Sequence, residues 1–225
     1  MKYRLGIFKI FLTIMLSISS LAMTEEKTYD CLRLPQEPEM DGQIIGDPAW
    51  HSIKPVFDFI RIDTKQPAFK ETSLRIGYTP KALYFGITCQ EPEIGNIHSN
   101  REDGGFVWMD DSIEIFLMPA NFSDYFHFVI NSDAARFSSK NSGTNHIMWN
   151  WQGQVCKTKD GYIMEIQIPF EILKSVPEKN EIWRFNVCRN VRFSEGINIT
   201  WANMIYSYHE LNHFAKLSFD DDVST

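Results

Sequence analysis

Residues 108–117, WMDDSIEIFL, place a tryptophan beside three carboxylates in a segment that otherwise alternates like a β-strand. Such a set could form a catalytic acid pair, a metal site, or a ring and a hydroxyl acceptor in a binding surface. Neighbouring side chains of a strand point to opposite faces. Asp110 and Asp111 therefore do not share a site, and opposite parity argues against catalysis by Asp111 and Glu114. Asp111 has the parity of the core and is expected to accept backbone amides at the strand start.

Two further segments have one apolar and one polar face. In 125–131, His127 points away from the apolar side chains, and in 182–190 Asn186 does the same. We therefore expect Glu114, His127 and Asn186 to line a shallow, hydrogen-bonding, concave sheet surface. Each side chain is a candidate contact for a polar ligand.

The same residues also have structural interpretations. Trp108 could belong to the core, although the glycines and acids around it favour exposure as a stacking platform. Glu114 and His127 could be ordinary solvated side chains. Six extended residues span about 20 Å, so Trp108 and Glu114 can meet one ligand only if the loop 107–110 curls back over the sheet.

Other charged and aromatic residues are less decisive. Arg189 has core parity, and both a ligand contact and a buried ion pair with Glu165 or Glu114 are open to it, since a buried arginine needs such a partner. Trp149 and Trp151 share parity and could extend a binding surface. The tryptophans at 50, 183 and 201 are assigned to the core.

Short strand-like stretches recur along the chain, and no segment keeps a helical period over three turns. Each stretch is rich in β-branched and aromatic residues and is bounded by turn formers. Helical turns are expected only at 47–53 and 169–174. The pattern predicts an all-β fold, a jelly-roll type antiparallel β-sandwich. The stretches are 56–60, 73–78, 82–89, 112–117, 125–131, 162–168, 182–191, 198–201 and 213–219.

The chain begins with the pattern of a secretory signal peptide. Lys2, Arg4 and Lys9 precede an apolar run at 10–18, and cleavage is expected after Ala22. A membrane anchor is the alternative, but the run is shorter than the ~20 residues that a bilayer requires. We expect a secreted or periplasmic protein with no membrane contact after cleavage. The expected division is a signal peptide at 1–22, a leader segment at 23–39 and one β-sandwich domain at 40–220.

Composition narrows the classes of partner. Cleavage would take the formal net charge from −7 to −10, because the signal carries three basic residues. An acidic surface disfavours nucleic acids and anionic membranes. The sequence has four cysteines and no CxxC motif. Four cysteines allow three disulfide pairings, and their spacing does not favour any one of them. These cysteines are Cys31, Cys89, Cys156 and Cys188.

A series of short motifs follows in a characteristic order: Asp41-Gly42, DPAW at 47–50, ALYF at 82–85, DSIEIF at 111–116, DGY at 160–162, IPF at 168–170, WRFN at 183–186 and FAKL at 214–217. In this order they resemble family 9 carbohydrate-binding modules, within the wider DOMON-like superfamily. The resemblance covers about residues 40–219. It implies a non-catalytic β-sandwich that binds a poly- or oligosaccharide, often as the partner of a glycoside hydrolase. It requires no cofactor, although calcium as a structural ion is implied.

The resemblance also implies roles for particular residues. Trp108 and Tyr208 match two rings that sandwich a sugar, and Glu114 matches an acid that binds sugar hydroxyls. Val129 and Cys188 stand where the family has an arginine and a glutamine that contact sugar. The resemblance therefore does not fix the glycan.

Two other functions stay open. A DOMON-type haem-binding domain for electron transfer would need axial Met, His or Lys ligands, for which His127 and several methionines are available. A non-catalytic protein-interaction module of the cell envelope is the other. The tail 220–222, three aspartates, is expected to be solvated, with calcium binding as the alternative.

Overall fold

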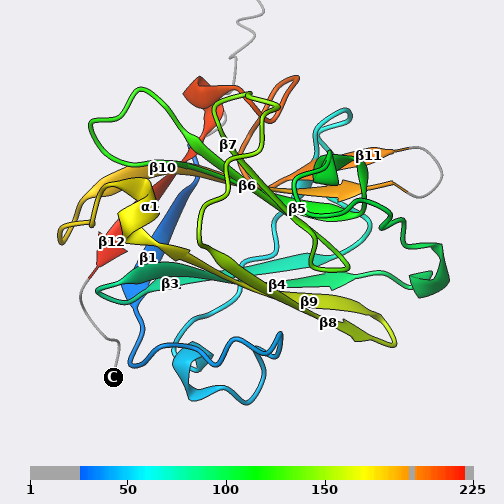
Figure 1. The fold of residues 1–225 in the computed structure, drawn as a ribbon, viewed down its shortest axis with the longest axis horizontal. Coiled ribbons are helices and arrows are strands. Elements are labelled where there is room, and N and C mark those ends of the chain that lie inside the picture. The colour runs from blue at the N-terminus through cyan, green and yellow to red at the C-terminus, as the bar shows by residue number, and fades with distance from the viewer. Residues whose placement is uncertain (1–25, 193–195, 221–225) are drawn as a thin grey trace, which may run out of the picture.

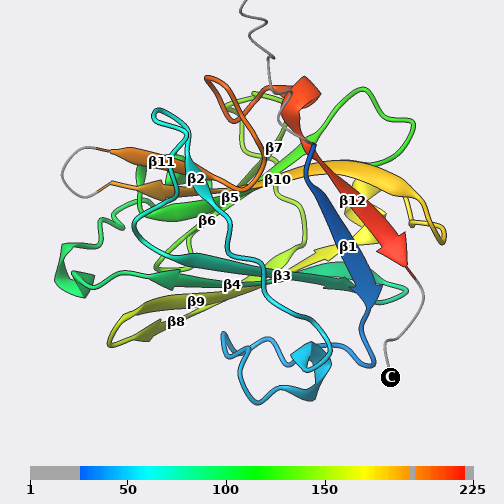
Figure 2. The same ribbon diagram turned by 180° about the vertical axis from the view of Figure 1, so that it is seen from behind.

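The computed structural model of this protein describes residues 26–192 and 196–220. The signal peptide expected at 1–22 lies outside the described residues. The described chain is an all-β sandwich with one α-helical turn (Figures 1 and 2). Its strands are β1 (Thr28–Arg33), β2 (Ile60–Arg61), β3 (Thr72–Tyr78), β4 (Ala82–Gln90), β5 (Ser112–Met118), β6 (Phe126–Asn131), β7 (Arg136–Lys140), β8 (Gln152–Thr158), β9 (Gly161–Pro169), β10 (Ile182–Val191), β11 (Ile197–Thr200) and β12 (Ala215–Asp220). The helices are α1 (Phe170–Leu173) and the 3₁₀ turns η1 (Pro48–Trp50), η2 (Ile94–Asn96), η3 (Val107–Met109) and η4 (Leu211–His213).

The strands form one hydrogen-bonded sheet in the order β7-β6-β5-β10-β12-β1-β3-β4-β9-β8. Off this path, β11 pairs with β10, and β2 pairs with β11. This sheet folds into two layers that face each other, one around β5, β6 and β10 and the other around β3, β4 and β9 (Figure 1). Strands β12 and β1 connect the layers at one side. Neighbouring strands are antiparallel except at β1, which runs parallel to both β12 and β3.

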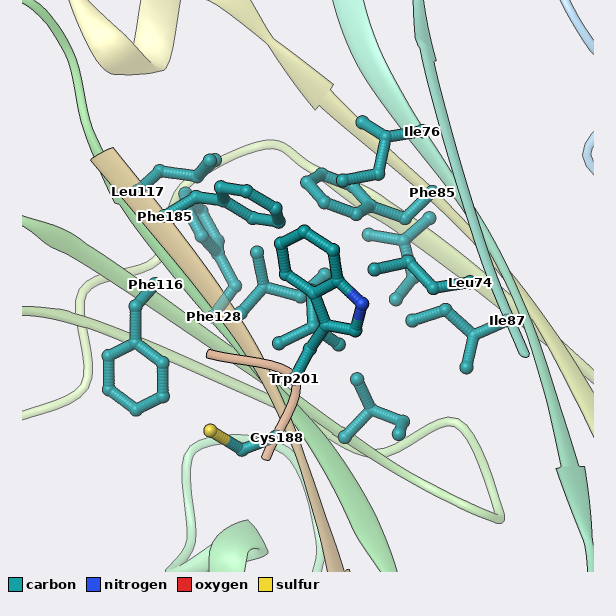
Figure 3. Close-up of a cluster of buried hydrophobic side chains, with 14 of the residues drawn as sticks. Leu74, Ile76, Phe85, Ile87, Phe116, Leu117, Phe128, Phe185, Cys188 and Trp201 are labelled. Carbon is teal, nitrogen blue, oxygen red and sulfur yellow. The ribbon is translucent and has the colours of Figure 1, made fainter. Parts of the chain in front are cut away.

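The core lies between the two layers. Phe185 and Trp201 come from the β10 side, and Leu74 and Phe85 face them from β3 and β4 (Figure 3). Alternation in β5 follows the sequence expectation, because Ile113, Ile115 and Leu117 are buried in this core. Glu114 therefore points to the outer face of its layer.

Strand β1 departs from the sequence expectation. The leader predicted at 23–39 contains Thr28–Arg33, which pairs with Lys216–Asp220 on one side and with Gly77–Tyr78 on the other. Tyr29 and Cys31 point into the core. The segment is an internal strand of the sheet because its pairing partners lie far away in sequence, where local alternation does not reveal them.

The outer faces of both layers are partly covered by irregular segments. Residues 34–53 lie under the layer of β3, β4 and β9, where Ile44, Trp50 and Ile53 pack on Ala82 and Tyr84 (Figure 2). On the other layer, residues 201–214 cover part of β5 and β10. The Phe116 ring lies 5.7 Å from that of Phe214. The uncovered remainder of this second face holds the site described below.

Two expectations about single residues are wrong. Trp151 is 2% exposed, and its ring lies 5.5 Å from that of Phe128 in the core. Trp149 is partly buried against the same core, and the buried Trp151 does not extend a binding surface. Arg189 is buried as its parity implied, but its ionic partner is Glu91, at 3.7 Å, instead of Glu165 or Glu114.

The four cysteines are all free thiols, and three of them are buried. Within residues 26–192 and 196–220, no helix is long and apolar enough to cross a membrane.

Candidate functional site

A pocket of about 360 Å³ opens on the outer face of the β5–β6–β10 layer. Three strands supply its floor, and the loops after β7, before β5 and before β12 supply its walls. The lining includes Trp108, Glu114, His127, Asn190, Arg192 and Tyr208. The pocket thus joins four of the five residues that the sequence analysis assigned to ligand binding.

Glu114 lies at the floor with both carboxylate oxygens engaged. Oε2 lies 2.7 Å from His127 Nε2 on β6, and Oε1 accepts a hydrogen bond of 2.7 Å from Asn190 Nδ2 on β10. Strand pairing creates this meeting, because β5 lies between β6 and β10. Each carboxylate oxygen keeps a further lone pair with which it can accept a ligand hydroxyl.

The charge of Glu114 is stabilised where it lies. Burial would raise the pKa of the Glu114 carboxyl, but the hydrogen bond and charge of His127, together with Asn190, lower it below its ordinary value. His127 itself is only 3% exposed, and its ring stacks on Phe116 with centroids 4.5 Å apart. The floor of the pocket therefore presents an anionic acceptor held in one orientation.

Arg192 links this floor to the wall. Its Nη2 donates to Asn190 Oδ1 at 2.8 Å and to the Trp108 carbonyl at 2.7 Å, and its Nη1 donates to Asn198 Oδ1 at 3.1 Å. A planar guanidinium with fixed donors suits such a junction. Arg192 thereby fixes the backbone of Trp108 relative to β10 and β11.

Trp108 belongs to η3, the 3₁₀ turn that precedes β5. This turn folds the loop 107–110 back over the sheet, as the sequence analysis expected, so that Trp108 and Glu114 line the same pocket. The Trp108 ring is partly buried, with its edge against Phe137 at 4.8 Å between centroids. One part of the ring packs on the protein and the rest is available to a ligand.

The two aspartates beside Trp108 hold its loop in place. Asp110 Oδ2 accepts hydrogen bonds from the Asn100 and Arg101 amides at 3.1 and 2.8 Å. Asp111 accepts from the His98 amide at 2.8 Å and from the Arg192 amide at 3.3 Å. The sequence expectation that Asp111 binds backbone amides is confirmed.

The opposite wall contains two tyrosines of very different exposure. Tyr208 is 8% exposed, and its hydroxyl lies 3.1 Å from each of the carbonyls of Arg189 and Ile199. Tyr206 lines the same pocket and is 86% exposed. Tyr206 therefore presents the larger free ring surface, whereas Tyr208 is anchored at the back of the pocket.

A second histidine, His209, also lines the pocket. His209 Nδ1 lies 2.6 Å from the Tyr125 hydroxyl, and its ring lies 5.6 Å from that of His127. Burial, followed by the charge of His127, lowers the pKa of His209 although Glu114 opposes this effect. Burial and the Glu114 charge raise the pKa of Tyr125 to about 12. Tyr125 therefore remains a neutral phenol over the range of ordinary pH.

Asn186 is the one predicted contact that the structure places elsewhere. It has the expected parity on β10, but it is fully buried beside Thr200 and Ala202. Its Oδ1 accepts the Ala202 amide at 3.0 Å. Residues 201–214 cover this part of the polar face, so Asn186 holds the covering segment instead of lining the pocket.

The sequence analysis missed Asn190, Arg192 and Tyr206. Asn190 shares the strand face of Asn186, so alternation could have identified it. Tyr206 lies two residues before Tyr208 in a segment of bends and turns, where strand alternation gives no signal. Arg192 gave no periodic signal, because its role depends on the distant carbonyl of Trp108.

The arrangement suits reversible binding of a hydroxyl-rich ligand. It offers aromatic rings, an anionic acceptor and amide groups that both donate and accept. A glycosidase needs a second carboxyl facing Glu114, but Asp111, whose pKa burial raises, points toward the core and is 1% exposed. In the described ranges, no group of three or more His, Cys, Asp or Glu side chains could hold a metal ion.

Fold and site together define a β-sandwich ligand-binding module. A family model described as carbohydrate family 9 binding domain-like matches residues 40–207, and the chain belongs to that family. The resemblance seen in the sequence is thereby confirmed. No curated protein matches the chain.

Solved structures share the fold. A family 9 carbohydrate-binding module from Caldicellulosiruptor kristjanssonii in complex with cellotriose is 18% identical, with a TM-score of 0.66 over 88% of this chain and 96% of that one. A family 9 module from the same organism in complex with glucose is 19% identical, with a TM-score of 0.67 over 88% of this chain and 98% of that one. A protein from Bacteroides uniformis, proposed to bind carbohydrate, is 14% identical, with a TM-score of 0.68 over 87% of this chain and 100% of that one.

Proposed function

We propose that this protein is a secreted, non-catalytic module that binds a glycan in the pocket over Glu114 and serves in polysaccharide utilisation. The observation that carries the proposal is the pairing of a partly free Trp108 ring with the buried carboxylate of Glu114 in one pocket. Family membership supports carbohydrate as the ligand class.

The pocket would recognise a sugar by two kinds of contact. The Trp108 ring stacks on the C–H face of a pyranose, as aromatic faces do on other flat partners. Glu114 accepts a sugar hydroxyl while His127 and Asn190 hold its carboxylate in place. Tyr208 was the second ring implied by the resemblance; its burial favours Tyr206 as the ring that meets the sugar and Tyr208 as its support.

The protein would act by binding alone. Asp111 is turned away from Glu114, and among the residues that the structure describes no second acid lines the pocket to take part in hydrolysis. Prolonged incubation with xylan or cellulose should release no new reducing ends. A glycoside hydrolase is the partner we propose in the same compartment, and intact-mass measurement of protein from a secreting host should show cleavage after Ala22.

A glycan array on the mature protein, followed by calorimetry, tests the function. Glucose and cellotriose are the first probes, because the similar structures hold them. We expect saturable binding with one site per chain. An absorbance scan of the same sample checks for haem. Absence of binding to every glycan, or a Soret band, would overturn the proposal.

A further inference from the structure

A second exposed ring lies directly beside Trp108, outside the pocket. Phe106 is 50% exposed, and its ring centroid lies 5.1 Å from that of Trp108 with 41° between the planes. The two rings are therefore in contact, so an aromatic surface extends from Trp108, which lines the pocket, to Phe106 beside the loop 100–105.

The loop in front of Phe106 is shaped around a polar recess. Residues 100–106 line a hollow of about 560 Å³ that is separate from the pocket and has Phe106 as its aromatic wall. Its lining includes Asn100, Arg101, Glu102 and Asp103, whose side chains carry amide, guanidinium and carboxylate groups. Donors and acceptors of both charges beside one ring suit a neutral polyhydroxyl unit.

Local structure holds this recess in shape. Gly104 has a φ of 78°, which glycine adopts readily, and its amide donates to the Arg136 carbonyl at 2.8 Å. Asp110 Oδ2 binds the amides of Asn100 and Arg101. The recess is thus anchored by the same aspartate that flanks Trp108, so its position relative to the pocket is fixed.

We infer that Phe106 and the recess 100–105 form a second subsite, which takes the next sugar unit of a glycan whose first unit occupies the pocket. This inference rests on the proposed function. Its occupant follows from continuity, because a chain leaving the Trp108 ring meets the Phe106 ring next. The protein then binds oligosaccharides more tightly than single sugars.

Calorimetry with two ligand series tests the subsite: glucose with cellobiose to cellotetraose, and xylose with the corresponding xylo-oligosaccharides. For the series that binds, affinity should rise with chain length in the wild type. Phe106→Ala should remove about fivefold or more of the affinity for the longer ligands, by analogy with base–aromatic stacking, and leave the monosaccharide unchanged. Phe106→Tyr, which keeps the ring, should retain the gain.

Phe57→Ala is a matched control, because Phe57 is 49% exposed and lies outside both hollows. It should bind every ligand like the wild type. Equal losses for the monosaccharide and the longer ligands in Phe106→Ala would show that Phe106 only supports Trp108 and would overturn the subsite. Unchanged affinity for all ligands would overturn it too, whereas a wild type that binds no sugar would refute the proposed function itself.

Discussion

Two buried glutamates occupy equivalent places on the two layers of the sandwich, and only one is at a site. Glu114 on β5 and Glu165 on β9 both point outward, and their exposed fractions are 4% and 0%. Glu114 lies at the floor of an open pocket between His127 and Asn190. Glu165 is covered by the segment 34–53.

The partners of Glu165 are all donors of that covering segment. Oε1 accepts from Trp50 Nε1 at 2.8 Å, and Oε2 accepts from the amides of Gly42 and Asp41 at 2.9 and 3.1 Å. Burial raises the pKa of Glu165 despite these hydrogen bonds, whereas His127 lowers that of Glu114. A buried acid on an outer strand face is therefore not itself evidence of a site; an opening above it and a positioned partner make the difference.

The largest expected effect separates the two glutamates by stability. Glu165→Ala leaves three donors without an acceptor, and each of the two buried ones, Trp50 Nε1 and the Gly42 amide, costs about 1–3 kcal/mol. We expect the free energy of unfolding to fall by about 3 kcal/mol or more in urea titrations. Glycan affinity of the folded fraction should stay within about twofold, since Glu165 is remote from the pocket. A Glu165→Ala protein as stable as the wild type would contradict the structural role assigned to Glu165.

The ring substitutions come next and concern the pocket wall. Trp108→Ala and Tyr206→Ala should each weaken glycan binding by ~1–3 kcal/mol, or roughly 5- to 150-fold, by analogy with base–aromatic stacking. Tyr208→Ala should instead lower the melting temperature, because its ring is buried. Calorimetry and thermal melts on the three variants distinguish these roles. A stable Tyr208→Ala with lost binding, beside a normal Tyr206→Ala, would restore Tyr208 as the sugar-facing ring.

Glu114→Gln sharpens the comparison by removing charge without changing shape. We expect a loss of about 1–3 kcal/mol in binding free energy, because a hydrogen bond to a charged acceptor is lost. Calorimetry with the tightest glycan measures it. The matched variant Glu165→Gln should bind like the wild type. Equal losses in both variants would mean that Glu114 acts on the fold and not on the ligand.

The smallest effect is a pair of opposite pH dependences. The lowered pKa of Glu114 means that its carboxylate stabilises the fold above pH 4.5, and that this contribution is lost as the pH falls through the lowered value. The raised pKa of Glu165 means that stability increases as the pH falls through the raised value toward 4.5. Unfolding titrations against pH on the wild type and both Gln variants should show each slope disappear in its own variant. Slopes of the same sign would contradict the assignment.

The sequence predicted what is local in this fold. Alternation placed Glu114 and His127 on one outer face because side-chain direction in a strand depends only on position. It could not place β1, whose partners are distant strands, or show that residues 201–214 cover Asn186. It could not separate Tyr206 from Tyr208 either, because the bend at 205–206 and the turn at 208–209 expose one ring and bury the other, and alternation does not predict this. The partners of Arg192 and Glu165 likewise depend on long-range contacts.

A crystal structure of the protein with its tightest glycan tests the central claim most directly. The account predicts a sugar ring in the pocket, stacked on Trp108, with a hydroxyl within hydrogen-bond distance of the Glu114 carboxylate and the chain continuing toward Phe106. A glycan bound on another face, such as the surface over the segment 34–53, with the pocket over Glu114 empty, would contradict it.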